Sequence, residues 1–168
     1  MVFHGGAKRV EVIGSWYTDV TLNYLCNLGE LREVYTGDFV TLGSNINFND
    51  SVVNVVTSFR CTNNGDKKKI VNVDFSSIKE AGKLLDLRIK NHSIVGANNI
   101  GKLTNLSRLE ISDTVFNNLK PLSHLTNLTY LNLNSCQITD ISYLGNLEKI
   151  NMQYIDNGVT REDWFNLS

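Results

Sequence analysis

Three related hexapeptides occupy the middle of the chain: Leu84-Leu-Asp-Leu87-Arg-Ile89, Leu106-Ser-Arg-Leu109-Glu-Ile111 and Leu128-Thr-Tyr-Leu131-Asn-Leu133. Corresponding residues of neighbouring copies are 22 positions apart. A fourth copy, Leu147-Glu-Lys-Ile150-Asn-Met152, places Ile150 19 residues after Leu131. A repeat of about this length, with leucines in this arrangement, predicts a solenoid in which each coil stacks on the next.

The end of each hexapeptide alternates apolar and outward residues, which is the two-residue period of a β-strand. Such a short strand cannot bury its apolar side alone, so we expect the copies to stack as a parallel sheet around a shared core. We expect strands to start near residues 10, 31, 53, 71, 87, 109, 131 and 150.

The remainder of each repeat has an apolar residue at every third position. Examples are the series that begins at Phe116 and ends at Leu131 and the series from Ile138 to Ile150. A period of three is too short for an ideal α-helix and fits 3₁₀ turns or an extended return. We therefore expect a 3₁₀ or extended convex side.

Residues 103–146, LTNLSRLEISDTVFNNLKPLSHLTNLTYLNLNSCQITDISYLGN, resemble the 22-residue leucine-rich repeats of bacterial internalin-type proteins. The similarity is strong over about residues 84–152. It implies an α/β solenoid with a parallel concave sheet, and it says almost nothing about function. In this family an inward polar residue, usually Asn or Cys, bonds the backbone of the neighbouring coil. The corresponding residues here are His92, Thr114 and Cys136, and we expect a buried neutral histidine at the first.

The length of 168 residues favours one leucine-rich repeat domain. Within it, we expect regular repeats over 76–157 and a short C-terminal capping helix over 158–168. The segment Thr160-Arg-Glu-Asp163 resembles a capping box, and Trp164 and Phe165 after it could cover the last coil.

Residues 1–75 are interpreted as a β-rich, irregular part, built either of degenerate repeats or of a β-cap. Two interpretations of residues 52–75 compete. One is a β-hairpin around the turn sequence Asn63-Asn-Gly-Asp66. The other, slightly favoured, is two more parallel repeat strands, because Ile78, Ala81 and Leu84 continue the series of three.

The composition of the chain limits the kinds of partner and cellular location that are expected. The charges nearly balance, with 16 basic and 17 acidic residues, so net charge indicates neither a nucleic-acid nor a membrane partner. The three cysteines Cys26, Cys61 and Cys136 lack the spacing of a disulfide framework, and we interpret them as reduced thiols. The sequence shows no secretory signal and no transmembrane segment, which predicts a cytoplasmic or particle-associated protein.

No motif indicates catalysis. His4, His92 and His124 are isolated, and the sequence contains no paired cysteines, P-loop or nucleophile elbow. The chain is therefore predicted to be non-enzymatic, with no catalytic residue, cofactor or metal. The lysines of Asp66-Lys-Lys-Lys69 are interpreted as a solvated loop tip.

The predicted binding site is the concave face of the sheet. Residues that flank the strand leucines must point away from the core, and side by side they form a surface of the kind on which solenoids commonly bind partners. Tyr130 is the expected anchor, because aromatic residues and arginine dominate interface energies. The predicted partner-binding residues are Asp86, Arg88, Lys90, Arg108, Glu110, Ser112, Tyr130, Asn132, Asn134, Lys149, Asn151 and Gln153.

Three functional hypotheses follow. The first is a protein-binding module that uses the concave face, with a protein partner and no nucleic acid or membrane. The second is a structural subunit of a larger assembly such as a phage or virion particle, in which self-assembly uses the aromatic ends Trp16, Tyr17, Trp164 and Phe165. The third is a bacterial effector or immunity protein that acts inside a cell.

Overall fold

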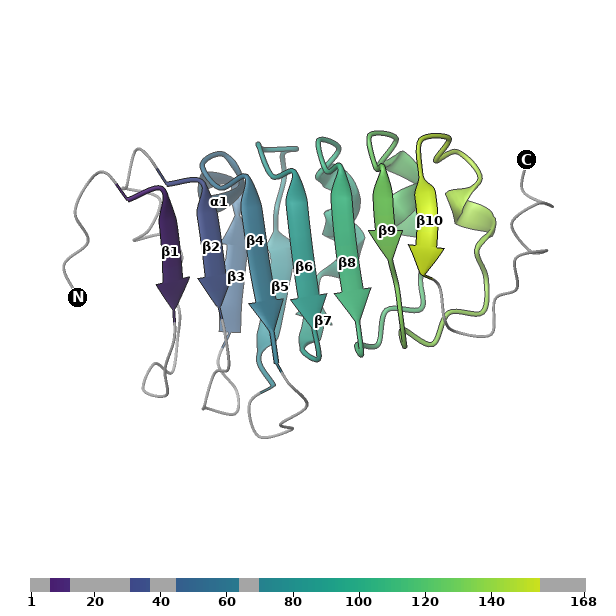
Figure 1. The fold of residues 1–168 in the computed structure, drawn as a ribbon, viewed down its shortest axis with the longest axis horizontal. Coiled ribbons are helices and arrows are strands. Elements are labelled where there is room, and N and C mark those ends of the chain that lie inside the picture. Colours follow the sequence, from purple (N-terminus) through teal and green to yellow (C-terminus); the bar gives the residue numbers. More distant parts are fainter. Residues whose placement is uncertain (1–6, 13–30, 37–44, 64–69, 155–168) are drawn as a thin grey trace.

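The computed structural model describes residues 7–12, 31–36, 45–63 and 70–154. Its main feature is a seven-stranded sheet in which all neighbouring strands are parallel (Figure 1). Its strands, in spatial order, are β1 (Arg9–Val12), β2 (Glu33–Thr36), β4 (Ser58–Thr62), β6 (Asp86–Lys90), β8 (Arg108–Ser112), β9 (Tyr130–Asn132) and β10 (Asn151–Tyr154). The order follows the chain, as expected for stacked coils of a leucine-rich repeat solenoid.

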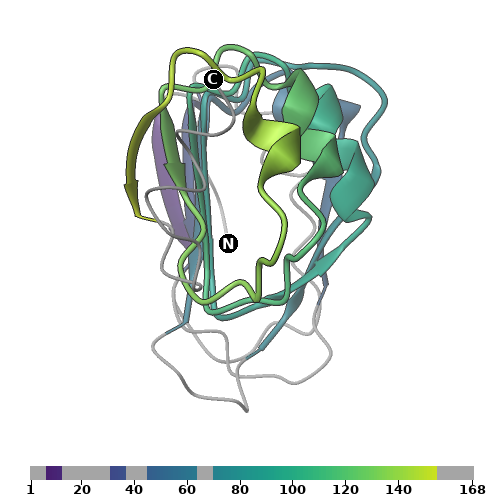
Figure 2. The ribbon, with the colours of Figure 1, turned by 90° about the vertical axis from the view of Figure 1, so that its right-hand side faces the viewer.

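The opposite side of the solenoid changes character along the chain. Figure 2 shows the seven-stranded sheet along one side of the coil and the helical turns along the other. The elements on this convex side are the parallel three-stranded sheet β3 (Asn45–Asn49), β5 (Asn72–Ser77) and β7 (Ser93–Val95), then the 3₁₀ helices η3 (Ala97–Lys102), η4 (Lys120–His124) and η5 (Ser142–Leu144). A short α-helix, α1 (Asp50–Val53), follows β3.

The three-residue period corresponds to 3₁₀ turns, as predicted. Successive backbone N–H groups donate to the carbonyl three residues earlier, with N···O distances of 3.0 Å for Leu106 to Leu103 and 2.9 Å for Leu128 to Leu125. Every third residue thus returns to the same side of the chain. This explains why one leucine per turn is buried and why the two residues between them carry polar groups.

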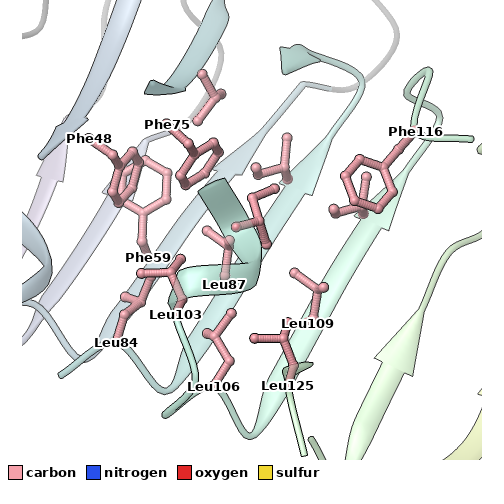
Figure 3. Close-up of a cluster of buried hydrophobic side chains, with 14 of the residues drawn as sticks. Phe48, Phe59, Phe75, Leu84, Leu87, Leu103, Leu106, Leu109, Phe116 and Leu125 are labelled. Carbon is pink, nitrogen blue, oxygen red and sulfur yellow. The ribbon is translucent and has the colours of Figure 1, made fainter. Parts of the chain in front are cut away.

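The core fills the space between the two sides of the solenoid. Leu87 and Leu109 from the sheet are fully buried. In the N-terminal half the filling is aromatic: the Phe48 ring meets Phe59 edge-on at 4.6 Å and stacks on Phe75 at 4.8 Å (Figure 3). The three rings come from β3, β4 and β5, in the part of the solenoid where a second sheet closes the coil.

The inward polar residues contact neighbouring backbone. His92 is 3% exposed, and its Nδ1 accepts a hydrogen bond from the Val71 N–H at 3.2 Å. The Cys136 thiol donates to the Ile111 carbonyl of the preceding coil at 3.1 Å, whereas Thr114 donates to the Ser112 carbonyl of its own coil. Burial raises the pKa of Cys136 to about 12, so its thiol stays protonated. The buried position predicted for His92 is therefore confirmed.

Of the two predictions for residues 52–75, the hairpin is wrong, and the prediction of two parallel repeat strands is right only for the strand near 71. Val52 and Val53 lie in α1, and the strand of the main sheet is five residues further on, at Ser58–Thr62. The strand expected near 71 is β5, which belongs to the convex sheet and pairs with β3 and β7. The hairpin fails as well, because β4 and β5 lie in different sheets.

Local hydrogen bonds explain why the valine run is helical. The Asn49 side chain accepts from the Val52 N–H at 3.1 Å, which caps the helix. The Asp50 carboxylate accepts from the backbone N–H groups of Lys79 and Glu80, at 2.8 and 3.0 Å, and ties the turn to the next coil. The helix buries Val52 and Val53 as completely as a strand could.

The last strand is also shifted from its predicted position. The register pairs Met152 with Leu131, so the repeat is 21 residues long, whereas the sequence suggested that Ile150 is the equivalent residue. The capping helix predicted over 158–168 and the aromatic ends Trp16, Tyr17, Trp164 and Phe165 lie outside the described residues.

Candidate functional site

The outward side chains of the seven-stranded sheet form rows across the strands. This surface is called the sheet face below, and it corresponds to the concave face of the sequence analysis. Its first row contains Arg9, Glu33, Ser58, Asp86, Arg108 and Tyr130. Its second row contains Tyr35, Arg60, Arg88, Glu110 and Asn132, and a shorter third row contains Thr62, Lys90 and Ser112.

Most of the predicted binding residues lie together on this face. The members that share the first two rows are Asp86, Arg88, Arg108, Glu110, Tyr130 and Asn132. Lys90 is exposed in the third row, and its Nζ lies 3.9 Å from the Asp113 carboxylate. Asn134 follows the end of β9 and is partly exposed. These positions agree with the prediction, while the role of the residues in binding stays a prediction.

Other predicted members are placed differently. Ser112 is only 6% exposed, so it offers a partner little surface. Lys149 precedes β10, and its Nζ donates to the Asn127 side chain at 3.3 Å, which places it beside the turn before the strands. The error follows from the shifted register of the last copy. Asn151 and Gln153 belong to β10, but their side chains lie outside the described part of the chain.

The sequence analysis missed the residues that β4 contributes. Arg60 lies in the second row between Tyr35 and Arg88, and Ser58 and Thr62 flank it on the same strand. The signal was present: in Ser58-Phe-Arg-Cys-Thr62 the apolar residues alternate with polar ones, as in the other strands. It was overlooked because the 28-residue spacing from Phe59 to Leu87 is longer than that of the regular repeats.

Asp86 lies at the centre of three arginines. Arg88, two residues along the same strand, donates to both carboxylate oxygens, with Nε···Oδ1 of 2.8 Å and Nη2···Oδ2 of 2.7 Å. This bidentate pair is the strongest contact of the group and raises the pKa of Arg88. From the strands on either side, Arg60 Nη2 lies 3.8 Å and Arg108 Nε lies 3.9 Å from the same carboxylate.

Arg108 links this charged group to Tyr130. Its guanidinium carbon lies 3.6 Å from the centre of the Tyr130 ring on the neighbouring strand, in cation–π geometry. Its Nη2 donates to Glu110 at 3.2 Å. Its Nε is buried and makes no hydrogen bond within the described part of the chain. These contacts hold Tyr130, Arg108 and Glu110 in one arrangement.

The sheet face is more basic than the chain as a whole. Its described side chains include five cations, Arg9, Arg60, Arg88, Lys90 and Arg108, and three carboxylates, Glu33, Asp86 and Glu110. The difference is +2, whereas the whole chain carries −1. Arg60 and Arg88 are direct neighbours in the second row.

The size of a hollow on the sheet face bears on what this surface could bind. A hollow on it, between Arg9, Glu33, Tyr35, Ser58 and Arg60, has a volume of about 60 Å³, far below the roughly 300–1,000 Å³ of a typical small-molecule site. Among the described residues, no group of three His, Cys, Asp or Glu side chains could hold a metal ion. Within the same residues, no helix has the length and hydropathy to cross a membrane.

Comparison with known proteins shows a fold and no closer relationship. A scan against protein-family models and a search of curated proteins both find no match. Among solved structures, internalin C2 of Listeria monocytogenes strain 4b F2365 is 24% identical, with 75% of this chain and 62% of that chain covered and a TM-score of 0.46.

Internalin F of the same strain is 20% identical, with 77% of this chain and 43% of that chain covered and a TM-score of 0.53. The chain thus spans less than two thirds of the length of either protein. The likeness to internalin F shows the fold alone: an internalin-like leucine-rich repeat solenoid, as the sequence predicted.

Proposed function

We propose that this leucine-rich repeat protein is a non-enzymatic module that binds a protein partner through the sheet face. The observation that carries the proposal is the ordered group of Arg108, Tyr130 and Glu110. Arginine and tyrosine are the residue types most often found at the energetic centre of interfaces. Here they are already stacked and hydrogen-bonded, so binding would cost little side-chain ordering.

The shape of the surface supports a protein partner over a small molecule. Parallel strands present the outward residues of four successive coils side by side, from β4 to β9 (Figure 1). Their side chains are partly exposed and interconnected, and the hollow on this face is too small for a typical ligand. Side-chain contacts that extend across several strands suit a protein partner better than a small ligand, which binds in a concave pocket.

The test compares two pairs of substitutions in an affinity pull-down from the native source. Arg108→Ala with Tyr130→Ala removes one cation and one tyrosine from the sheet face. Lys120→Ala with Tyr143→Ala likewise removes one cation, here a lysine, and one tyrosine from η4 and η5, where both residues are exposed. We expect the first variant to lose its partner, because interface anchors contribute about 2 kcal/mol or more, equivalent to about 30-fold in affinity.

The control variant should retain the partner, and circular dichroism should show that both variants are folded. Retention of the partner by the sheet-face variant would refute this proposal. Light scattering on the native protein tests the alternative of a structural subunit: a high-order oligomer, or recovery within a particle, would replace the binding module with an assembly role. An intracellular effector or immunity protein would be distinguished by the identity of the captured partner.

A further inference from the structure

A buried histidine lies at a hydrogen-bonded corner of the solenoid. His92 follows the end of β6 and is 3% exposed. The Val71 N–H donates to His92 Nδ1 at 3.2 Å, and the Ser93 N–H donates to the Val71 carbonyl at 3.0 Å. Asn72 and Ser93 are the first register partners of β5 and β7. His92 therefore holds the backbone at the point where these two convex strands begin to pair.

The hydrogen bond from Val71 requires a neutral imidazole. A ring nitrogen accepts a hydrogen bond only while it carries no proton, so the single proton of the neutral His92 ring lies on Nε2. A proton on Nδ1 would point at the Val71 N–H and remove the acceptor. It would also place a positive charge at a buried position, which is unfavourable. The closed arrangement of this corner therefore excludes a protonated His92.

The corresponding residues of the next two coils make bonds that mild acid does not break. Thr114 donates its hydroxyl proton to the Ser112 carbonyl, and Cys136 donates its thiol proton to the Ile111 carbonyl. The hydroxyl does not ionise, and burial raises the pKa of Cys136 to about 12, so both groups remain donors. His92 is instead an acceptor. Of these three inward positions, only His92 makes a bond that depends on pH between about 5 and about 8.

The charged side chains that border His92 in the described part of the chain are Asp113 and Lys90. Asp113 comes from the next coil and lines a hollow beside His92, and the other described residues of that hollow are uncharged: Ile70, Asn91, Ser93, Ile94, Thr114 and Val115. Lys90 ends β6, and its Nζ lies 3.9 Å from the Asp113 carboxylate. Opposite charges this close largely offset each other at the ring. The protonation of His92 is therefore controlled mainly by its burial and by the bond from Val71.

We propose that His92 is an acid-sensitive latch at the start of the β5–β7 pairing. One proton taken up on Nδ1 breaks the bond from the Val71 N–H and opens this corner of the convex sheet. A histidine exposed to water takes up a proton near about pH 6.5. The opened state binds this proton and the closed state does not, so the stability of the closed state falls as the pH falls below about 6.5.

The experiment compares the pH dependence of stability in the full-length wild type, His92→Asn and His124→Asn. Urea unfolding is measured at about pH 7.5 and about pH 5.0. A histidine that is protonated only after opening should lower the folded-to-unfolded ratio about 30-fold between these values. Asparagine accepts the same hydrogen bond through an uncharged amide, so the ratio should fall about 30-fold less in His92→Asn than in the wild type. His124 is exposed, and His124→Asn should show the wild-type pH dependence.

Nuclear magnetic resonance on the wild type tests the latch without any substitution. Ring nitrogen shifts identify the tautomer, and at about pH 7.5 we expect the proton of His92 on Nε2. Hydrogen exchange of the Val71 amide, corrected for the intrinsic effect of pH, reports the opening of the bond itself. We expect its protection to fall between about pH 7.5 and about pH 5.0 in the wild type, and to be retained in His92→Asn.

Four results would overturn the latch. The first is a proton on Nδ1 of His92 in the wild type at neutral pH, and the second is a Val71 amide whose protection does not change in acid. The third is an equal pH dependence of the wild type and His92→Asn, and the fourth is an effect of the same size in His124→Asn. If His92→Asn does not fold, the tautomer and the Val71 exchange of the wild type still decide the question.

Discussion

The aromatic contact between Phe48 and Phe59 provides a direct test of how the N-terminal half is built. Phe48 comes from the convex strand β3 and Phe59 from the main sheet, and both are fully buried with their rings 4.6 Å apart. The strand positions that the sequence suggested, near 53 and 71, do not predict a contact between the Phe48 and Phe59 rings. A double-mutant cycle measures whether they do.

Replacing either phenylalanine with leucine should destabilise the protein by about 1–2 kcal/mol, less than the roughly 3–5 kcal/mol expected for truncation to alanine. Each single change removes the same ring contact, so the double variant loses it only once. An edge-to-face pair is worth about 0.5–1.5 kcal/mol beyond burial. The double variant should therefore be more stable than the sum of the single effects predicts, by about that amount.

The assay is urea unfolding followed by circular dichroism, with equal slopes required for all four proteins. The control cycle pairs Phe48 with Phe116, which lies apart from the aromatic cluster (Figure 3). Its effects should add to within about 0.3–0.5 kcal/mol. If the Phe48–Phe59 cycle is equally additive, the two rings do not touch, and the two-sheet arrangement of this half is wrong.

Three further predictions test the solenoid. Leu109→Asp should abolish native circular dichroism, because it places a charge in the shared core, whereas Leu85→Asp, at a 46% exposed position, should leave the fold intact. A folded Leu109→Asp variant would show that the strand register is wrong. Gly82→Ala should lower the free energy of unfolding by about 1–3 kcal/mol, since Gly82 has φ +60° and a Cβ there would lie 2.5 Å from Val53 atoms. An unchanged urea midpoint would contradict this backbone geometry. Backbone hydrogen bonds from Lys79 and then Glu80 lower the pKa of Asp50 below 3.8, so the carboxylate stabilises the fold above that pH and loses this effect as the pH falls through the folded pKa. Between about pH 6 and about pH 3, the urea midpoint should therefore fall less steeply for Asp50→Asn than for the wild type. Equal pH dependence of the two midpoints would refute this linkage.

The 22-residue repeat period predicts the positions of some residues of the candidate site but not of all. Arg108 and Tyr130 are 22 residues apart, and a strict repeat already places them on neighbouring strands with the same orientation. The cation–π contact between them follows from that equivalence. The position of Arg60 was not predicted, because its strand belongs to a repeat of different length. The regular 22-residue spacing therefore could not show that Arg60, Arg88 and Arg108 lie near one another.

The solenoid, the parallel sheet after residue 84, the 3₁₀ turns and the outward residues of β6, β8 and β9 could all be predicted from the sequence. These features recur in each regular repeat, and each copy supports the register of the next. The structure was required to show that the valines of α1 are helical, that β5 joins a second sheet, and that Arg60 lies beside Arg88. The physical reason is that a short apolar run is buried equally well as helix or strand, so the choice depends on which neighbouring coil it packs against and on caps such as Asn49.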